Sequence, residues 1–141
     1  ILETLSAEPR LMGPMGSGMA SKLALNQLIA SLTPGFSMDR RLVRAQGVAV
    51  EDFMEVLRPS AVYAPTYDKK LERMLDQHYD NPNFSTALLR KDLGLLLHAS
   101  QQAGLDASGL QGILELLQQA QGDAIDGLDY CALHELTQAQ R

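Results

Sequence analysis

Apolar side chains recur along most of the chain at the three- and four-residue spacing that places them on one face of an α-helix. No segment shows a sustained alternation of apolar and polar residues, which is the pattern of a half-buried β-strand. The only strand-like stretch is the short segment of residues 10–12, just before the first glycines. The pattern therefore predicts an all-α fold, with a single domain of about six helices.

Turn-forming and capping residues divide this pattern into separate helical segments. The expected helices are residues 17–46, 50–57, 66–79, 84–104, 107–121 and 126–135. Pro34 and Gly35 should kink or interrupt the first helix, because proline has no N–H to donate. Gly47 and Gly104 should close the first and fourth helices, and Asp106 should cap the start of the fifth.

The helical spacing also indicates which apolar residues belong together on a helix. The residues that repeat most clearly are Leu23, Leu28, Ile29, Leu32, Leu71, Met74, Leu75, Leu88, Leu89, Leu95, Leu96 and Ala99. In the third helix, Leu71, Met74 and Leu75 are expected to point inward. A methionine-rich start, consisting of Met12, Met15 and Met19, is expected to fill gaps in the core, because methionine is unbranched and flexible.

Composition narrows the class of protein. The chain has 141 residues and a net charge of −5, without a basic block, so a nucleic-acid surface is not expected. Its apolar stretches are too short to cross a bilayer, and no signal-peptide pattern opens it. The single cysteine, Cys131, cannot form an internal disulfide, and no cysteine–histidine cluster has zinc spacing, so we expect no metal and a reducing, cytoplasmic setting. The chain begins at Ile1, which suggests a piece of a longer protein.

The stretch GPMGSGMASKLALN, residues 13–26, is the first candidate for chemistry. It lacks the Gly-Lys-Ser/Thr ending of a phosphate-binding P-loop, and its glycines stand in the wrong order for a dinucleotide fingerprint. What remains is a turn followed by a helix on which Lys22 and Asn26 share one face. Gly18, one turn earlier, leaves that face bare and is a candidate substrate-binding position.

Two interpretations of Lys22 remain open at this point. A lysine held partly buried in apolar surroundings would have a lowered pKa and could serve as a proton donor or acceptor. The alternative is a lysine at the edge of an amphipathic helix with its ammonium in water. Lys91 and Asp92, in the middle of a leucine-rich helix, lie either at a face boundary or beside a polar cleft.

The three histidines, His78, His98 and His134, lie in separate helices without ligand spacing. Each is therefore expected to be an ordinary surface or core residue rather than a catalyst.

The motifs GPMGSGMASKLALN, AQGV, SAVYAPTYDKK and FSTALLRKDLGLLLHASQQAGLD occur in this order along the chain. Together they resemble the C-terminal domain of the β-hydroxyacid dehydrogenases, a family that includes 3-hydroxyisobutyrate dehydrogenase and glyoxylate/succinic semialdehyde reductase. The resemblance covers nearly the whole chain. It implies an all-α domain similar to the C-terminal domain of 6-phosphogluconate dehydrogenase, over residues 13–141, with residues 1–12 forming the end of an N-terminal Rossmann domain that this chain lacks.

The resemblance also implies roles for individual residues. Lys22 matches the family's catalytic lysine and Asn26 its helper asparagine, whereas Lys91 matches a lysine on the cofactor side. Phe84 and Asp92 match residues of the substrate pocket. The cofactor would be NAD or NADP, the substrate a small hydroxy acid or aldehyde acid, and the protein a homo-oligomer, such as a dimer, with no nucleic-acid or membrane partner.

Two rival functions remain in view. One is a non-catalytic helical module for oligomerisation, because some relatives have lost the lysine. The other is an imine reductase, although such enzymes typically replace the lysine. The presence of both Lys22 and Asn26 favours the hydroxy-acid oxidoreductase.

Overall fold

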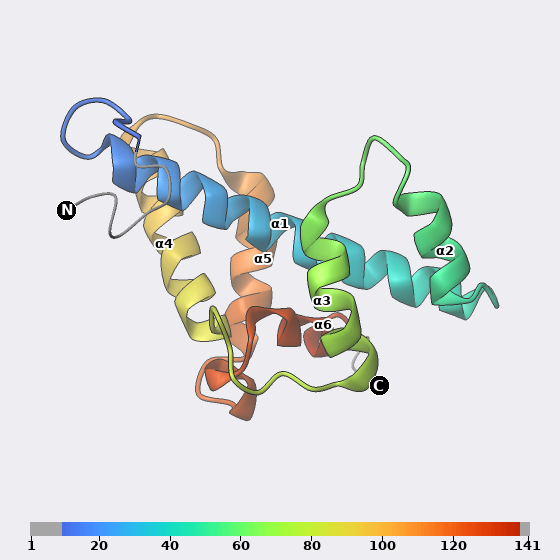
Figure 1. Ribbon diagram of the computed structural model, residues 1–141. Helices are drawn as coiled ribbons and strands as arrows, with labels where there is room; N and C mark the ends of the chain where they lie inside the picture. Colours follow the sequence, from blue (N-terminus) through green and yellow to red (C-terminus); the bar gives the residue numbers. More distant parts are fainter. Residues whose placement is uncertain (1–9, 139–141) are drawn as a thin grey trace.

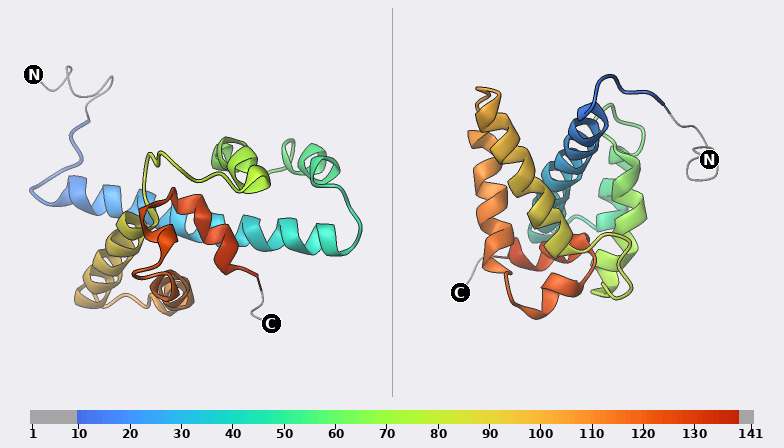
Figure 2. Two further views of the ribbon diagram at one scale, coloured as in Figure 1. Left: turned by 90° about the horizontal axis from the view of Figure 1, so that it is seen from below. Right: turned by 90° about the vertical axis from the view of Figure 1, so that its left-hand side faces the viewer.

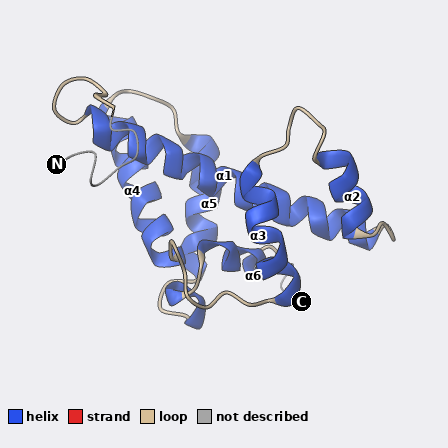
Figure 3. Cartoon of the chain, viewed as in Figure 1, coloured by secondary structure: helices blue, strands red, loops and turns tan. Residues whose placement is uncertain are grey.

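The computed structural model describes residues 10–138. Within that range, the chain forms α-helices and two short 3₁₀ helices, and it contains no β-strand (Figure 3). The helices are α1 (Ser17–Ala45), α2 (Val50–Leu57), α3 (Pro65–Asp76), α4 (Thr86–Gln102), α5 (Ser108–Gln119), η1 (Ala124–Gly127), η2 (Tyr130–Ala132) and α6 (Leu133–Leu136). The predicted all-α class is confirmed. Residues 10–12, the strand-like stretch, are not a strand, and residues 1–9 lie outside the described range.

Helix α1 is the central element of the fold, and the other five α-helices pack against it or against each other (Figure 1). The antiparallel pair α4 and α5 lies along its N-terminal half, whereas α2 and α3 lie along its C-terminal half. Helix α6 and the two 3₁₀ helices fill the space between these two groups. Seen along α1, the α4–α5 pair and the α2–α3 pair form opposite walls (Figure 2).

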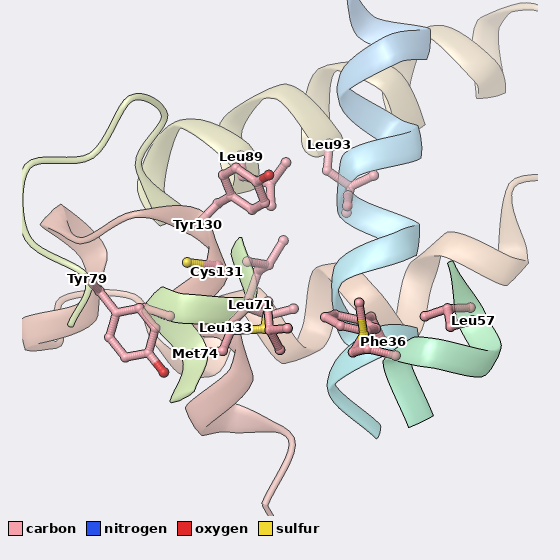
Figure 4. Packing of buried hydrophobic residues seen from close by; sticks show 14 residues of the cluster. Phe36, Leu57, Leu71, Met74, Tyr79, Leu89, Leu93, Tyr130, Cys131 and Leu133 are labelled. Atoms are coloured by element: carbon pink, nitrogen blue, oxygen red, sulfur yellow. The ribbon is translucent and has the colours of Figure 1, made fainter. Parts of the chain in front are cut away.

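The core lies where these groups meet. Figure 4 shows Phe36 of α1 near Leu57 of α2, and Tyr130 and Cys131 near Leu89 of α4. The buried apolar cluster consists of Ala30, Phe36, Met54, Leu57, Leu71, Met74, Tyr79, Leu89, Leu93, Leu117, Tyr130, Cys131, Ala132 and Leu133. Because every helix from α1 to α6 contributes to it, the domain has one continuous core.

The predicted interruption of the first helix is wrong. Helix α1 continues through Pro34, and Figure 2 shows it passing this point without a sharp change of direction. Proline removes the N–H that would bond the carbonyl of Ala30, which costs stability locally. Helix packing offsets this cost, because Ala30 and Phe36, on either side of the proline, are both buried. The fold therefore overrides the local signal.

Local signals at the helix ends are confirmed. Gly47 follows the C-cap of α1 with a φ of 80°, and the N–H of Val48 donates to the carbonyl of Val43 at 2.9 Å. Gly104 plays the same part after α4, with a φ of 68°. A left-handed residue costs little only when it is glycine, which explains both positions. The Asp106 carboxylate accepts the N–H of Ser108 at 2.9 Å, at the start of α5.

The expected final helix over residues 126–135 is broken into η1, η2 and α6. Asp129 is the cause. It takes an extended conformation between the pieces, and its carboxylate accepts the N–H of Cys131. Its own N–H donates to the carbonyl of Tyr79, and it forms an isolated β-bridge with Ser85. These long-range bonds replace the helical ones.

Several residues expected in the core are exposed instead. Leu75 of α3 is 49% exposed, and the methionines expected to fill core gaps are at least half exposed. These methionines are Met12, Met15 and Met19. Other apolar residues of the helical repeats, Leu28, Leu88 and Leu95, are also exposed. The helical periodicity is correct, but one of the apolar faces that it indicates is not covered by this chain.

Candidate active site

The site begins at the turn that leads into α1. Gly13 and Gly16 have φ angles of 121° and 97°, which other residues rarely adopt. A side chain at Gly13 would also approach the hydroxyl of Ser17 to 3.1 Å. Nothing lies within 4 Å of a side chain placed at Gly18. The turn thus starts the helix while leaving its first exposed face open, one turn before Lys22.

Helix α4 supplies the other side of the site. The Ser85 side chain caps its start by accepting the N–H of Leu88. Two turns later, Asp92 points from α4 toward α1, and its side chain is only 3% exposed. The Asn26 amide donates to Asp92 Oδ2 at 2.7 Å. Asn26 and Asp92 therefore tie the two helices together at the base of the site.

Two ammonium groups complete the arrangement around this carboxylate. Lys22 Nζ lies 3.6 Å from Asp92 Oδ2, and Lys91 Nζ lies 3.4 Å from Asp92 Oδ1. Both lysine side chains are more than half exposed, at 57% and 60%. The buried carboxylate thus holds two cations at the surface, and the group carries a net positive charge. It can hold a negative ligand group and place an ammonium against it.

The structure shows where the predicted site residues lie, and their roles stay predictions. Lys91 and Asp92 differ in exposure. The Asp92 side chain is buried against α1, whereas the Lys91 side chain is exposed at the rim of the site. A partly buried lysine was one of the two interpretations of Lys22, but its side chain is more exposed than buried in this chain. Lys22, Asn26, Lys91 and Asp92 form one group, as one would expect of a common site.

An apolar rim surrounds this charged group. Met19 and Leu25 flank Lys22 and Asn26 on α1, and Met15 lies in the turn just before that helix. Leu88 and Leu95 flank Asp92 on α4. Each of these five apolar residues is more than 45% exposed. An exposed apolar surface of this kind, around a polar centre, is typical of a binding site or a docking face.

Phe84 was also predicted to belong to the site, but none of its described contacts reaches the charged group around Asp92. It lies before α4, about two turns from Asp92. Its ring packs edge to face on Tyr130, with ring centroids 6.1 Å apart. The ring is half-buried, so one part supports the core and another part remains accessible.

A buried ion pair elsewhere was not predicted from the sequence. Lys70 Nζ lies 2.7 Å from Asp129 Oδ2, and both side chains are almost fully enclosed. The Lys70 ammonium also lies over the ring of Tyr130, 4.6 Å from its centroid. Lys70 falls on the inward face defined by Leu71 and Met74, which is the signal that was available. The pair joins α3 to η2 and is closed to ligands.

A second polar cluster lies beneath the C-terminal half of α1. Arg40, only 1% exposed, approaches the His134 ring at 3.5 Å from its Nη1 to Nε2. Burial and the neighbouring Arg41 and Arg40 lower the pKa of His134 to about 4. One turn earlier on α1, the Ser37 hydroxyl is also buried and has no hydrogen-bond partner among the described residues. The cluster is therefore neutral at the imidazole and positive at the guanidinium.

The described part of the chain offers neither a metal site nor a membrane span. Among residues 10–138, no three acidic, histidine or cysteine side chains gather closely enough to hold a metal ion. None of the helices in that range is both long enough and apolar enough to span a bilayer. His78 and His98 are exposed and His134 is a core residue, in line with the expectation for each.

The fold is a single helical domain, and a comparison with protein-family profiles identifies its class. Residues 16–137 match the family profile described as the NAD-binding domain of NADP-dependent 3-hydroxyisobutyrate dehydrogenase. The chain belongs to this family. The resemblance inferred from the motifs is thereby confirmed, together with NAD or NADP as the cofactor of the family.

Curated relatives agree with this assignment. The chain is 31% identical over 126 residues to a probable 3-hydroxyisobutyrate dehydrogenase-like 1, mitochondrial, of Arabidopsis thaliana, covering 86% of this chain and 37% of the relative. It is 24% identical over 140 residues to the chloroplastic glyoxylate/succinic semialdehyde reductase 2 of the same plant, covering 99% and 39%. The chain thus spans about two fifths of these relatives. Their names give organelles, so the cytoplasmic setting stays a prediction.

Solved structures show the same fold. The 3-hydroxyisobutyrate dehydrogenase of Mycobacterium tuberculosis, determined with L-serine, superimposes with a TM-score of 0.86 at 22% identity, over 98% of this chain and 49% of that one. That of Salmonella typhimurium gives 0.75 at 16% identity, over 86% and 42%. At these identities the likeness establishes the fold, whereas the chemistry must be argued from the residues.

Proposed function

We propose that this chain is the helical, catalytic half of an NAD(P)-dependent oxidoreductase that acts on a small hydroxy acid or the corresponding aldehyde acid. The observation that supports this most directly is the group formed by Lys22, Asn26 and Asp92, with an ammonium held at the open surface. Relatives that align with 86% and 99% of this chain are named as a probable 3-hydroxyisobutyrate dehydrogenase-like protein and a glyoxylate/succinic semialdehyde reductase. A Rossmann domain preceding residue 13 is part of the proposal.

Lys22 is the proposed general acid and base. In carbonyl reduction, its ammonium would donate a proton to the oxygen that becomes the alcohol, and its positive charge would stabilise that oxygen as negative charge develops. In the reverse direction, the neutral amine would accept the hydroxyl proton. Docking of a second domain onto the apolar rim would exclude water and so strengthen these interactions.

Asp92 and Asn26 are the proposed positioning residues for Lys22. Asp92 is buried, so its charge is poorly screened and orients the ammonium 3.6 Å away. The neutral Asn26 amide donates a hydrogen bond to the same carboxylate oxygen at 2.7 Å, so it adds no charge to the site. Asn26 is also within one turn of Lys22, where its amide could bond a substrate.

The residues present fit a nicotinamide cofactor held at this face. The rim formed by Met15, Met19 and Leu88 offers an apolar bed for a flat ring, and the exposed Lys91 offers a cation toward a negative group. When bound, the nicotinamide supplies or accepts the hydride. The same net positive charge suits the carboxylate of a hydroxy acid.

The test requires the complete protein, with the segment that precedes this chain. Lys22→Ala should lower kcat/KM for 3-hydroxyisobutyrate or succinic semialdehyde by about 10²–10⁴-fold, the usual contribution of a general acid or base. Lys22→Arg should restore little, because guanidinium does not release its proton near neutral pH. Cofactor affinity should change little.

Lys69→Ala is a matched control, because Lys69 is an exposed lysine on α3, a helix that contributes nothing to the Lys22 group. If Lys22→Ala kept near-wild-type turnover with the same pH profile, the assignment of Lys22 would be wrong. If the wild-type protein neither oxidised 3-hydroxyisobutyrate nor reduced succinic semialdehyde with either cofactor, the proposed reaction would be wrong.

A further inference from the structure

The start of helix α4 is fastened by a segment that lies more than 40 residues later in the chain. The N–H of Thr86 donates to the carbonyl of Leu128 at 2.9 Å, and the Thr86 hydroxyl bonds the same oxygen at 3.3 Å. The N–H of Tyr130 donates to the carbonyl of Phe84 at 2.9 Å. The first turn of α4, whose N–H groups have no partners within the helix, is thus held from outside.

The same segment also fixes the rotation of α4 about its own axis. On the second turn of α4, Arg90 Nη2 donates to Asp126 Oδ2 at 3.0 Å. Figure 4 shows the ring of Tyr130 beside Leu89, on the side of α4 that faces the core. Residues 126–130, called the α4 seat below, therefore support the first two turns of the helix.

The α4 seat is anchored to α3 by the buried Lys70–Asp129 pair. The two charged atoms lie 2.7 Å apart, and the side chains are 11% and 0% exposed. The N–H of Asp129 also donates to the carbonyl of Tyr79, just after α3. Tyr130 lies under the Lys70 ammonium, and its hydroxyl lies 3.0 Å from that of Thr66. A continuous series of contacts thus runs from α3 through the seat to the start of α4.

The orientation of α4 determines the geometry at Asp92. Asp92 follows Thr86 by six residues, which corresponds to about 9 Å along the helix. A tilt of roughly 5° at the start of α4 would therefore move Asp92 by about 0.8 Å. Such a shift would stretch the 2.7 Å bond from Asn26 to Asp92 to the limit of a hydrogen bond. It would change the 3.6 Å separation of Asp92 from Lys22 by a similar amount.

Stability alone is a weak reason for a buried ion pair at this place. Removing two charges from water is costly, and apolar replacements of buried pairs are often equally stable. We propose that the Lys70–Asp129 pair is a positioning device for the Lys22 group. It fixes the α4 seat and the start of α4, and so holds Asp92 against Asn26 and beside Lys22. This inference rests on the proposed role of Lys22.

A double replacement in the complete protein separates positioning from stability. Lys70→Met combined with Asp129→Ser removes both charges, and the new hydroxyl can still accept the N–H of Cys131 that Asp129 accepts now. The double variant should therefore recover at least about half of the urea midpoint that Lys70→Met alone loses. Its kcat for succinic semialdehyde should nevertheless stay about tenfold to a hundredfold below wild type, because Asp92 is misplaced. The KM for the cofactor should change little.

Tyr79→Phe is the matched control. It removes a buried hydrogen bond from the Tyr79 hydroxyl to Glu135, which does not support α4. This variant should lower the urea midpoint and keep the wild-type kcat. A control that loses turnover as strongly as the double variant would contradict the inference, because activity would then follow stability alone.

Crystal structures of the wild type and the double variant provide a readout that needs no activity. Asp92 should be displaced from Asn26 in the double variant by about 0.5 Å or more, enough to weaken their hydrogen bond. An unmoved Asp92, or a double variant with wild-type kcat, would overturn the positioning role and leave the Lys22 assignment standing. A wild type without activity would instead refute the proposed reaction, and the position of Asp92 would still decide whether the pair orients α4.

Discussion

His134 provides a sharp test of the electrostatics of the fold. The ring is 6% exposed and lies against Arg40 and Arg41 of α1, with Arg44 further along the same helix and Glu135 as its acidic neighbour on α6. Burial and these arginines lower the pKa of His134 from 6.5 to about 4. Protonation therefore opposes folding, because the imidazolium would be both desolvated and repelled.

The magnitude follows from the linkage between protonation and unfolding. Because the pKa is lower in the folded state, the unfolded chain binds more protons below pH 6.5, and stability is lost as the pH falls. Lowering the pKa of His134 from 6.5 to about 4 corresponds to about 3 kcal/mol in the free energy of unfolding once the pH is below 4. About 2 kcal/mol of this should already be lost between pH 7.5 and pH 5.

Urea unfolding at a series of pH values measures this loss. Wild type and His134→Gln are compared by the slope of the free energy of unfolding against pH, so that a constant loss of packing in the variant does not matter. Between pH 7.5 and pH 5, the free energy of unfolding should fall by about 2 kcal/mol less in His134→Gln than in the wild type. His98→Gln is the control, because His98 is exposed. Equal slopes in wild type and His134→Gln would refute the reasoning.

Three further predictions concern the buried pair, the cysteine and the cofactor. Lys70→Met or Asp129→Asn alone should lower the free energy of unfolding by about 3–5 kcal/mol, since each leaves a buried charge unpaired; a loss below about 1 kcal/mol in urea unfolding would contradict this. Burial raises the pKa of the Cys131 thiol to about 12, so iodoacetamide at pH 8 should label the unfolded chain and leave the folded chain unlabelled in mass spectra. The 141-residue chain without any preceding segment should bind NAD(H) and NADP(H) negligibly, and a micromolar affinity in calorimetry would count against a separate cofactor domain.

Much of the fold could be predicted because its signals are local. Gly47 and Gly104 end helices for reasons of backbone conformation alone, and the apolar spacing fixed the type of each element. Breaks that depend on distant partners could not be read in this way. Asp129 divides the last helical segment through bonds to residues about 50 positions away, such as Tyr79 and Lys70.

The candidate site was predictable to a similar extent. Lys22 and Asn26 were placed on one face by their spacing, but the burial of Asp92 between α1 and α4 depends on how two helices pack. The exposure of Met19 and Leu88 contradicts a simple core assignment, because periodicity indicates an apolar face without telling which partner covers it. Lys70 and Arg40 show the converse, as charged residues that occupy inward positions.

The length of α1 has a consequence for how this protein can change. Lys22 and Arg44 lie on one unbroken helix, separated by about 33 Å of helical rise. This is several times the distance of roughly 8 Å over which salt at physiological concentration screens surface charges. A change of charge at one end of the helix therefore has almost no electrostatic effect on groups at the other end. A substitution that changes the charge near Arg44 should therefore leave the electrostatics of the Lys22 group unchanged, so the two ends of α1 can vary independently.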